Sequence, residues 1–183
     1  MNDGTYGPFV PLSGKNGPYV HNAEPGFVEK IIAALRSRGE TVATAESLTG
    51  GLVCAVLTSV PGSSAVVRGG LIVYATELKA TLAGVDAAAL HRLGAVDPLI
   101  AEQLAVGARE RCAATWGIGL TGVAGPDPQD GNAPGTVHVA VAGPDGVVLK
   151  SLQGHAGDRH EVRSAAVSIA LALLWTCLER ATG

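Results

Sequence analysis

The spacing of apolar residues along this chain switches repeatedly between the period of a helix and that of a strand. Residues 26–38 carry apolar positions at helical spacing, and Gly39 follows as a helix-ending glycine. The rest of the chain predicts, in order, a strand at 41–44, a helix from 52, a strand at 70–75, short helices from 76 and over 86–93, a helix from 98 to about 114, a strand at 116–121, a hairpin of 136–142 with 147–152, and a helix from about 158 to 180.

Helices that lie between strands, followed by one late hairpin, indicate an α/β fold. We expect a three-layer α/β/α sandwich whose mixed sheet is mostly parallel and has one antiparallel member. Ligands of such sheets gather at the carboxyl ends of the parallel strands, so the loops after Thr44, Ala75 and Thr121 should meet. The longest irregular stretch, 122–135, leaves a predicted strand directly and is placed to cover a ligand.

The length and composition bound the number of domains. The 183 residues suffice for one domain with a substantial core, which we place at 26–183. Residues 1–25 are rich in Gly, Pro and Asn and show no period, so we expect a flexible N-terminal tail there. Apolar residues make up 47% of the chain and aromatic residues only 4%, which predicts a core built mainly of Ala, Val and Leu.

Charge, cysteines and hydropathy argue against several classes of protein. The formal net charge of −3 gives no electrostatic reason to expect a nucleic-acid partner. Three widely spaced cysteines favour a reduced, cytoplasmic protein over a disulfide framework or a thiolate metal site. The first residues lack the features of a signal peptide, and the apolar run 165–177 is shorter than the roughly 20 residues of a membrane span. We therefore expect that run to be a buried helix and the protein not to enter a membrane.

A strand-to-helix turn at 45–51 carries a serine, Ser47, at the mouth of a helix. Backbone N–H groups in the first helical turn suit an anion or a developing oxyanion, and Thr49, Gly50 and Gly51 lie where these groups are found. The two glycines would let a substrate approach the backbone closely. The alternative is an ordinary capped turn in which Ser47 or Thr49 is the N-cap.

A serine hydroxyl needs a base to become a nucleophile, and none of the five histidines lies in the loops that should meet. Lys79 does lie there, and a lysine made neutral by desolvation can act as the base. Tyr74 would relay a proton or hold a substrate group. Glu46 is either a hydrogen-bonding support for the serine turn or a partner of Lys79. The alternative for Lys79 is a solvated residue in the first turn of a helix.

Further residues are candidates for contacts with the substrate. Thr121 and Gly122, at the end of a predicted strand, offer a hydroxyl and a backbone N–H. Arg163, one turn into the last helix, is suited to bind a phosphate bidentately, together with Arg159. Asp158 fits the N-cap of that helix. No metal or organic cofactor is needed for chemistry of this kind.

Several motifs occur together in a recognisable order. They include A-E-S-x-T-G-G at 45–51, Y-x-x-E-x-K at 74–79 and T-G-V-A-G-P at 121–126, with shorter ones at 68–70, 82–85, 94–96, 135–137 and 157–163. Through them the chain, from about 27 to 178, resembles the C-terminal domain family of the competence-damage-inducible protein CinA.

The resemblance implies an α/β/α fold and the activity of a nicotinamide-nucleotide amidase, which converts nicotinamide mononucleotide to nicotinate mononucleotide and ammonia. Ser47 is similar to the family's proposed nucleophile and Lys79 to its proposed base. In the mechanism that we expect, Lys79 takes the proton of Ser47, Ser47 attacks the carboxamide, and N–H groups at 49–51 hold the oxyanion. The partner is then a small nucleotide, and we expect a homo-oligomer.

The chain departs from the family's pattern at four positions: Leu48 stands where cysteine is common, Ala75 and Thr76 replace a frequent Ser-Asn pair, and Asn132 stands where lysine is frequent. These changes affect substrate contacts more than the two proposed catalytic residues. Two other functions remain open: a catalytically idle nucleotide-binding or sensor module, and an amidohydrolase that acts on another small amide.

Overall fold

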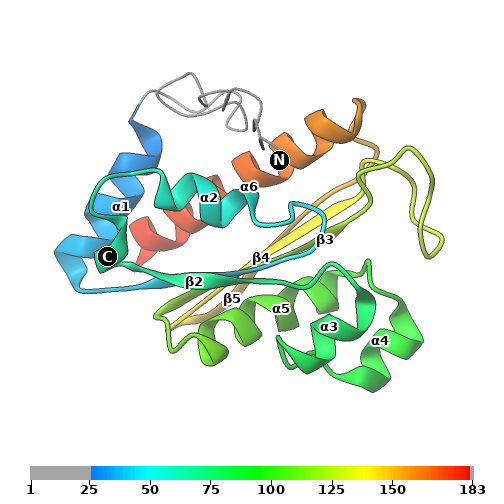
Figure 1. Cartoon of the computed structure of the whole chain (residues 1–183), viewed down its shortest axis with the longest axis horizontal. Coiled ribbons are helices and arrows are strands. Elements are labelled where there is room, and N and C mark those ends of the chain that lie inside the picture. Colours follow the sequence, from blue (N-terminus) through cyan, green and yellow to red (C-terminus); the bar gives the residue numbers. More distant parts are fainter. Residues whose placement is uncertain (1–25, 182–183) are drawn as a thin grey trace, which may run out of the picture.

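Five strands form one sheet in the computed structural model, which describes residues 26–181 (Figure 1). Their order is β2-β1-β3-β4-β5. The bounds are Val42–Glu46 for β1, Val67–Ile72 for β2, Trp116–Gly122 for β3, Val137–Gly143 for β4 and Gly146–Leu152 for β5. Strand β1 pairs in parallel with β2 and β3, whereas β4 pairs antiparallel with both β3 and β5. Only β4 therefore opposes the other four strands, which confirms a mostly parallel sheet with one antiparallel member.

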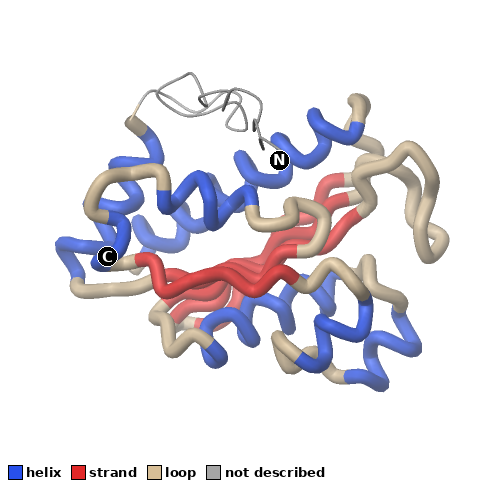
Figure 2. The backbone as a smooth tube through the Cα atoms, viewed as in Figure 1, coloured by secondary structure: helices blue, strands red, loops and turns tan. Residues whose placement is uncertain are grey.

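Helices cover both faces of the sheet, as Figure 2 shows with the red strands between two blue layers. One layer contains α1 (Phe27–Arg38), α2 (Leu52–Thr58) and α6 (Arg159–Arg180), and a short 3-10 turn spans Ser63–Ala65. The other layer contains α3 (Thr76–Thr81), α4 (Ala87–Leu93) and α5 (Pro98–Arg111). The predicted three-layer α/β/α sandwich is confirmed.

The helix ends follow from local sequence. Gly39 ends α1 in the left-handed conformation, at φ 64°. The Asp97 carboxylate accepts a hydrogen bond from the N–H of Leu99, and Pro98 occupies the first position of α5. Asp158 forms a capping box at the start of α6. These ends lie where the sequence predicted them.

Strand β3 presents two different faces to the helical layers. Ile118 and Leu120 point into the large core under α6, while Gly117 and Gly119 face α5. A Cβ at Gly119 would collide with the backbone of α5 at Ala101. The missing side chains let α5 lie directly against the strand, which is how a core poor in aromatic residues stays closely packed.

Three predicted boundaries were wrong. Strand β1, expected at 41–44, spans Val42–Glu46, because Ala45 and Glu46 still pair with both neighbouring strands. The strand expected at 70–75 spans Val67–Ile72, because its glycines pair with β1 (Thr44 opposite Gly70) and the chain leaves the ladder after Ile72. As an edge strand, β2 is only alternately covered, so its hydrophobic pattern marks its end poorly. Helix α5 stops at Arg111 rather than near 114, because Ala113 takes a left-handed conformation at φ 48°.

The apolar run at 165–177 lies in α6, whose interior is packed against the sheet. Among the described residues, α6 is the one helix that is long and apolar enough to span a membrane by length and composition, with a mean hydropathy of 1.5 in its most apolar window. Because 56% of that window is buried, α6 has the character of a core helix. The predicted tail at 1–25 lies outside the described residues.

Candidate active site

The carboxyl ends of β1, β2 and β3 meet at one pocket, as expected for parallel strands. Ser47 follows β1, Tyr74 follows β2, and Thr121 and Gly122 end β3; all four line a cleft with a volume of about 170 Å³. The other walls come from the turn before α5, from the first half of the loop 122–135, and from Arg159 at the start of α6. The pocket thus brings together Ser47 and Arg159, which lie 112 positions apart in the sequence.

Glu46 supports the serine turn from inside the protein. Its side chain is fully buried and accepts hydrogen bonds from the Thr44 hydroxyl (3.0 Å) and from the N–H groups of Gly51 (3.0 Å), Val53 (3.1 Å) and Cys54 (2.9 Å). A carboxylate therefore occupies the positive end of α2. Of the two roles predicted for Glu46, this geometry confirms the support. Glu46 does not line the pocket.

The N–H groups of Gly50 and Gly51 are already used, which corrects the expectation that they hold an oxyanion. Gly51 donates to Glu46, and Gly50 donates to the carbonyl of Ser47 (3.0 Å). The physical reason is that the buried Glu46 carboxylate accepts hydrogen bonds at the start of α2, while the turn itself is closed by the bond from Gly50 to Ser47. Among the described residues, none accepts a hydrogen bond from the N–H of Leu48 or Thr49. These two N–H groups are the donors that remain at the turn.

The capped-turn alternative is also corrected. Gly51 is the N-cap of α2, at φ 98°, and the N–H groups at the start of the helix donate to Glu46 instead of to Ser47 or Thr49. The Thr49 hydroxyl is buried without a hydrogen-bond partner among the described residues, and Thr49 does not line the cleft. The Ser47 side chain is therefore left for the pocket, where 8% of the residue remains exposed.

Arg163 holds the serine turn from the opposite side. Its Nε donates to the carbonyl of Leu48 (3.0 Å), and one terminal nitrogen donates to the carbonyl of Thr49 (3.0 Å). Arg163 does not line the cleft. The expectation that it is the main phosphate ligand is therefore corrected: its guanidinium is engaged with the backbone of the turn.

Lys79 is buried, so the alternative of a solvated helix residue was wrong. Only 1% of the residue is exposed, and its Nζ donates to the carbonyl of Val73 (3.0 Å). Val73 in turn donates its N–H to the carbonyl of Glu46 (2.9 Å), the residue before Ser47. Val73 thus links the lysine to the end of β1.

Burial lowers the pKa of the Lys79 ammonium below its ordinary value, and the charges of Asp130 and Glu77 oppose this effect. Ser47 and Lys79 make no direct hydrogen bond in the described part of the chain, and Lys79 does not line the cleft. A desolvated amine is suited to accept a serine proton once the two groups come within hydrogen-bond distance, and catalytic hydrogen bonds often tighten only when substrate binds.

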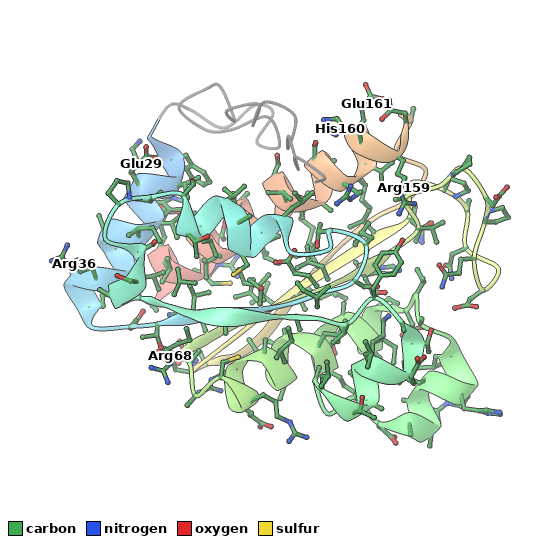
Figure 3. The ribbon with its side chains drawn as sticks, viewed as in Figure 1. Glu29, Arg36, Arg68, Arg159, His160 and Glu161 are labelled. Carbon is green, nitrogen blue, oxygen red and sulfur yellow. The ribbon has the colours of Figure 1, made fainter. Side chains whose placement is uncertain are left out.

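Arg159 and Tyr74 form the rim of the cleft. One terminal nitrogen of Arg159 donates to the Tyr74 hydroxyl (2.7 Å) and the other to the carbonyl of Gly125 (3.0 Å). Tyr74 is 58% exposed. Figure 3 shows Arg159 at the start of α6, on the side of the molecule where the loop 122–135 lies. Its guanidinium is thus the cation that faces the cleft.

Thr121 is anchored while it lines the pocket, because its hydroxyl donates to the carbonyl of Ala95 (2.6 Å). Its oxygen can still accept a hydrogen bond. At Gly122 a side chain would collide with the carbonyl of Thr136, so the pocket requires glycine there. Whether Thr121 and Gly122 contact a substrate stays a prediction.

Sequence reasoning missed two polar side chains of the cleft, Asp127 and Gln129. Both lie in the loop 122–135, which was identified by its length but has no period from which to tell inward from outward positions. Among the residues that the structure describes, no group of three or more His, Cys, Asp or Glu side chains is arranged to hold a metal ion.

The departures from the family's pattern lie around the cleft. Leu48 is buried in its wall, and Ala75 is the N-cap of α3 without a side-chain cap. Thr76 begins that helix. Asn132 does not replace a missing cation: its amide donates to the carbonyl of Val96 (3.1 Å) and so ties the long loop to the turn before α5.

Known proteins similar to this chain belong to one family. The profile of the CinA C-terminal domain matches residues 25–178. A CinA-like protein of Frankia casuarinae is 48% identical over 144 residues, which are 79% of this chain and 33% of that protein. A CinA-like protein of an Anaeromyxobacter species is 47% identical over 145 residues, 79% of this chain and 35% of that protein. The chain spans about a third of the length of these curated relatives.

Solved structures agree with the sequence matches. The competence/damage inducible protein CihA from Agrobacterium tumefaciens is 35% identical, with a TM-score of 0.78 over 87% of this chain and 99% of that one. A CinA superfamily protein from Klebsiella pneumoniae is 28% identical, with a TM-score of 0.80 over 84% of this chain and 96% of that one. These names describe a family and not a reaction.

Proposed function

Because this chain belongs to the CinA C-terminal domain family, we propose that it hydrolyses the carboxamide of nicotinamide mononucleotide to nicotinate mononucleotide and ammonia, with Ser47 as nucleophile and Lys79 as base. The observation that carries the proposal is a serine that lines the cleft directly after β1, together with a buried lysine on α3 that is held to the chain directly after the neighbouring parallel strand β2. Val73 accepts a hydrogen bond from Lys79 (3.0 Å) and donates one to the carbonyl of Glu46 (2.9 Å), the residue before Ser47.

The proposed reaction has two halves, each with a proton transfer through Lys79. First, the Ser47 hydroxyl gives its proton to the Lys79 amine while its oxygen attacks the carboxamide carbon. The tetrahedral intermediate then collapses, and ammonia leaves with the proton from Lys79. Water next attacks the ester on Ser47 in the same way and regenerates the free serine.

The N–H group of Leu48 is suited to stabilise the oxyanion of this intermediate. It follows the nucleophile directly, Leu48 lines the cleft, and it takes the role first expected of residues 50 and 51, whereas Thr49 is fully buried away from the cleft. An N–H directly after the nucleophile is a recurring oxyanion donor in serine hydrolases. The Leu48 N–H shares its peptide group with the carbonyl of Ser47, which accepts a hydrogen bond from the N–H of Gly50 (3.0 Å), and Arg163 holds the next two carbonyls of the turn.

The nucleotide phosphate is assigned to Arg159. This residue is exposed at the rim, whereas the cleft of about 170 Å³ suits the small aromatic amide that reacts. A guanidinium that bridges Tyr74 and Gly125 can exchange these neutral partners for a phosphate, which is a stronger acceptor. The proposal also includes a homo-oligomer, and a cytoplasmic location, where the free cysteines 54, 112 and 177 stay reduced.

Release of ammonia from nicotinamide mononucleotide tests the proposal. We expect turnover by the wild-type protein and a loss of at least about 1,000-fold in both Ser47→Ala and Lys79→Ala, since each removes a group needed for bond formation. Two exposed residues supply matched controls: Ser37→Ala and Lys150→Ala should keep full activity.

The outcomes separate the remaining functions. A folded protein that binds the nucleotide, with a raised melting temperature, but releases no ammonia would be a sensor module. Ammonia from another small amide, with the same dependence on residues 47 and 79, would keep the mechanism and change the substrate. Full activity in Ser47→Ala would reject the mechanism.

A further inference from the structure

A tight turn in the long loop carries an aspartate that the proposed mechanism does not use. Gln129 and Asn132 pair through two backbone hydrogen bonds of 3.0 and 2.8 Å. Between them, Asp130 and Gly131 both adopt left-handed conformations, at φ 51° and 76°. Two left-handed central residues define a type I′ turn, for which Asp-Gly is a preferred pair. The position of the Asp130 side chain is therefore fixed by its own backbone.

The Asp130 carboxylate is directed at the turn before α5. Its Oδ2 accepts a hydrogen bond from the N–H of Ala95 (3.0 Å), next to the bond from the Asn132 amide to Val96. Gly94 makes room for it: a Cβ there would lie 3.0 Å from the Cβ of Asp130. Two side chains of the loop thus fasten it to the 94–96 turn.

That turn is part of the cleft. Ala95 and Val96 line the pocket, and the carbonyl of Ala95 accepts the Thr121 hydroxyl (2.6 Å). The loop contributes Asp127 and Gln129 to the lining of the same cleft. A displacement of Asp130 would therefore affect both parts of this lining.

The same carboxylate acts on Lys79. Burial lowers the pKa of this ammonium, and the negative charge of Asp130 raises it in opposition, more strongly than Glu77 on α3 does. Both of these groups are carboxylates, so each favours the protonated form of Lys79. The base of a serine hydrolase must be neutral before the reaction and must still accept the serine proton during it. Burial, which favours the neutral amine, and a nearby carboxylate, which favours the ammonium, together meet these two requirements.

We propose that Asp130 is a positioning residue which fastens the loop 122–135 over the cleft through Ala95 and stabilises the ammonium that Lys79 becomes when it takes the proton of Ser47. This inference rests on the proposed function only for the role of Lys79 as base. In the transfer the proton moves from the Ser47 oxygen to the Lys79 nitrogen, and Asp130 stays ionised throughout.

The test compares Asp130→Asn and Asp130→Glu with the wild-type protein by two independent readouts. The first is the titration of the Lys79 side chain by ¹³C NMR, which needs no substrate and is assigned easily among four lysines with the Lys79→Ala spectrum. The second is the pH dependence of kcat. We expect Asp130→Asn to move both midpoints to lower pH and to reduce the maximal rate about tenfold. Asp130→Glu keeps the charge, so both of its midpoints should lie close to those of the wild-type protein.

Asp145→Asn, in the exposed β4–β5 turn, is the matched control and should change neither readout. If Asp130→Asn does not fold, Asp130→Ser keeps an acceptor for the Ala95 N–H without the charge. A Lys79 titration midpoint that is the same in the uncharged variant as in the wild type would overturn the inference, even if activity falls. If the wild type releases no ammonia, the proposed function fails, whereas the NMR titration still decides the role of Asp130.

Discussion

Arg159 and Arg163 lie one helical turn apart on α6 and have different tasks. Arg163 binds the carbonyls of Leu48 and Thr49, so it is part of the serine turn. Arg159 bridges Tyr74 and Gly125 at the rim. The difference follows from depth, since Arg163 is half-buried and Arg159 is exposed.

Alanine substitutions should separate these tasks. Arg159→Ala should raise KM for the nucleotide about 10–100-fold, because a charge-assisted contact of about 1.5–3 kcal/mol is lost, and should leave KM for the corresponding nucleoside unchanged. Arg163→Ala should instead lower the melting temperature and kcat for both substrates. Steady-state kinetics with the two substrates and thermal unfolding measure this. An Arg163→Ala variant that affects only the nucleotide KM would contradict the assignment.

At the scale of residues, the sequence predicted which side chains carry the chemistry better than it predicted which groups those side chains contact. A serine after a strand and a lysine in the neighbouring loop were sufficient to predict that Ser47 and Lys79 lie at one edge of the sheet. The burial of Lys79 was not predictable from its helix, because lysines are mostly exposed and only the packed structure shows the carbonyl that holds it. The same holds for Arg163, whose partners lie more than 100 residues away.

Helix α2 begins on a buried carboxylate, and the serine turn depends on it. Three N–H groups at its start and one hydroxyl donate to Glu46. A helix of seven residues has little stability of its own, so this contact and its packing against the core hold it in place.

Glu46→Gln should therefore unfold more easily and lose activity. The amide presents N–H donors to other N–H donors, which leaves buried groups unsatisfied and costs about 2 kcal/mol or more. Chemical denaturation measures the loss. Glu29→Gln, at an exposed position in the first turn of α1, is the control and should cost less than about 1 kcal/mol. Equal effects of the two substitutions would show that Glu46 does not support the turn.

At the scale of elements, caps and periods predicted the helices well, and the edge strand poorly. Asp97, Asp158 and Gly39 mark helix ends by contacts within a few residues, which a sequence can display. The extent of β2 is set instead by pairing with β1, and the closeness of α5 to β3 by Gly117 and Gly119. Both depend on partners distant in the chain.

The pH dependence of stability belongs to the whole molecule. His138 on β4 is 3% exposed, and its Nδ1 lies 2.8 Å from the Ser151 hydroxyl. Burial lowers the pKa of His138 below its ordinary value of 6.5, and the charge of Asp97 only partly opposes this. As the pH falls below 6.5, the unfolded chain therefore takes up the proton before the folded one does.

The contribution of His138 to the free energy of unfolding should therefore be fully present above its ordinary pKa of 6.5 and should decrease as the pH falls below that value, by at most about 1.4 kcal/mol per pH unit. His138→Gln should flatten this decrease. His91→Gln, on the exposed side of α4, should keep it. Denaturation series at several pH values measure this decrease. Plots of the free energy of unfolding against pH that run parallel for the wild type and His138→Gln would contradict the effect.

At the scale of the molecule, the alternation of helical and strand periods was sufficient to predict the three layers and the edge of the sheet where ligands bind. The sequence did not reveal which residues of the loop 122–135 face the cleft, because a loop has no period. Asp130 was missed for this reason, although the Asp-Gly pair marks a turn.

The most direct test of the central claim is to identify the residue that becomes acylated. Wild-type protein would be quenched in acid during turnover of nicotinamide mononucleotide, digested, and analysed by peptide mass spectrometry. The account predicts a nicotinate mononucleotide ester on Ser47, absent from Ser47→Ala, with ammonia released in the same step. An ester on another residue, or ammonia release by Ser47→Ala at the wild-type rate, would contradict it.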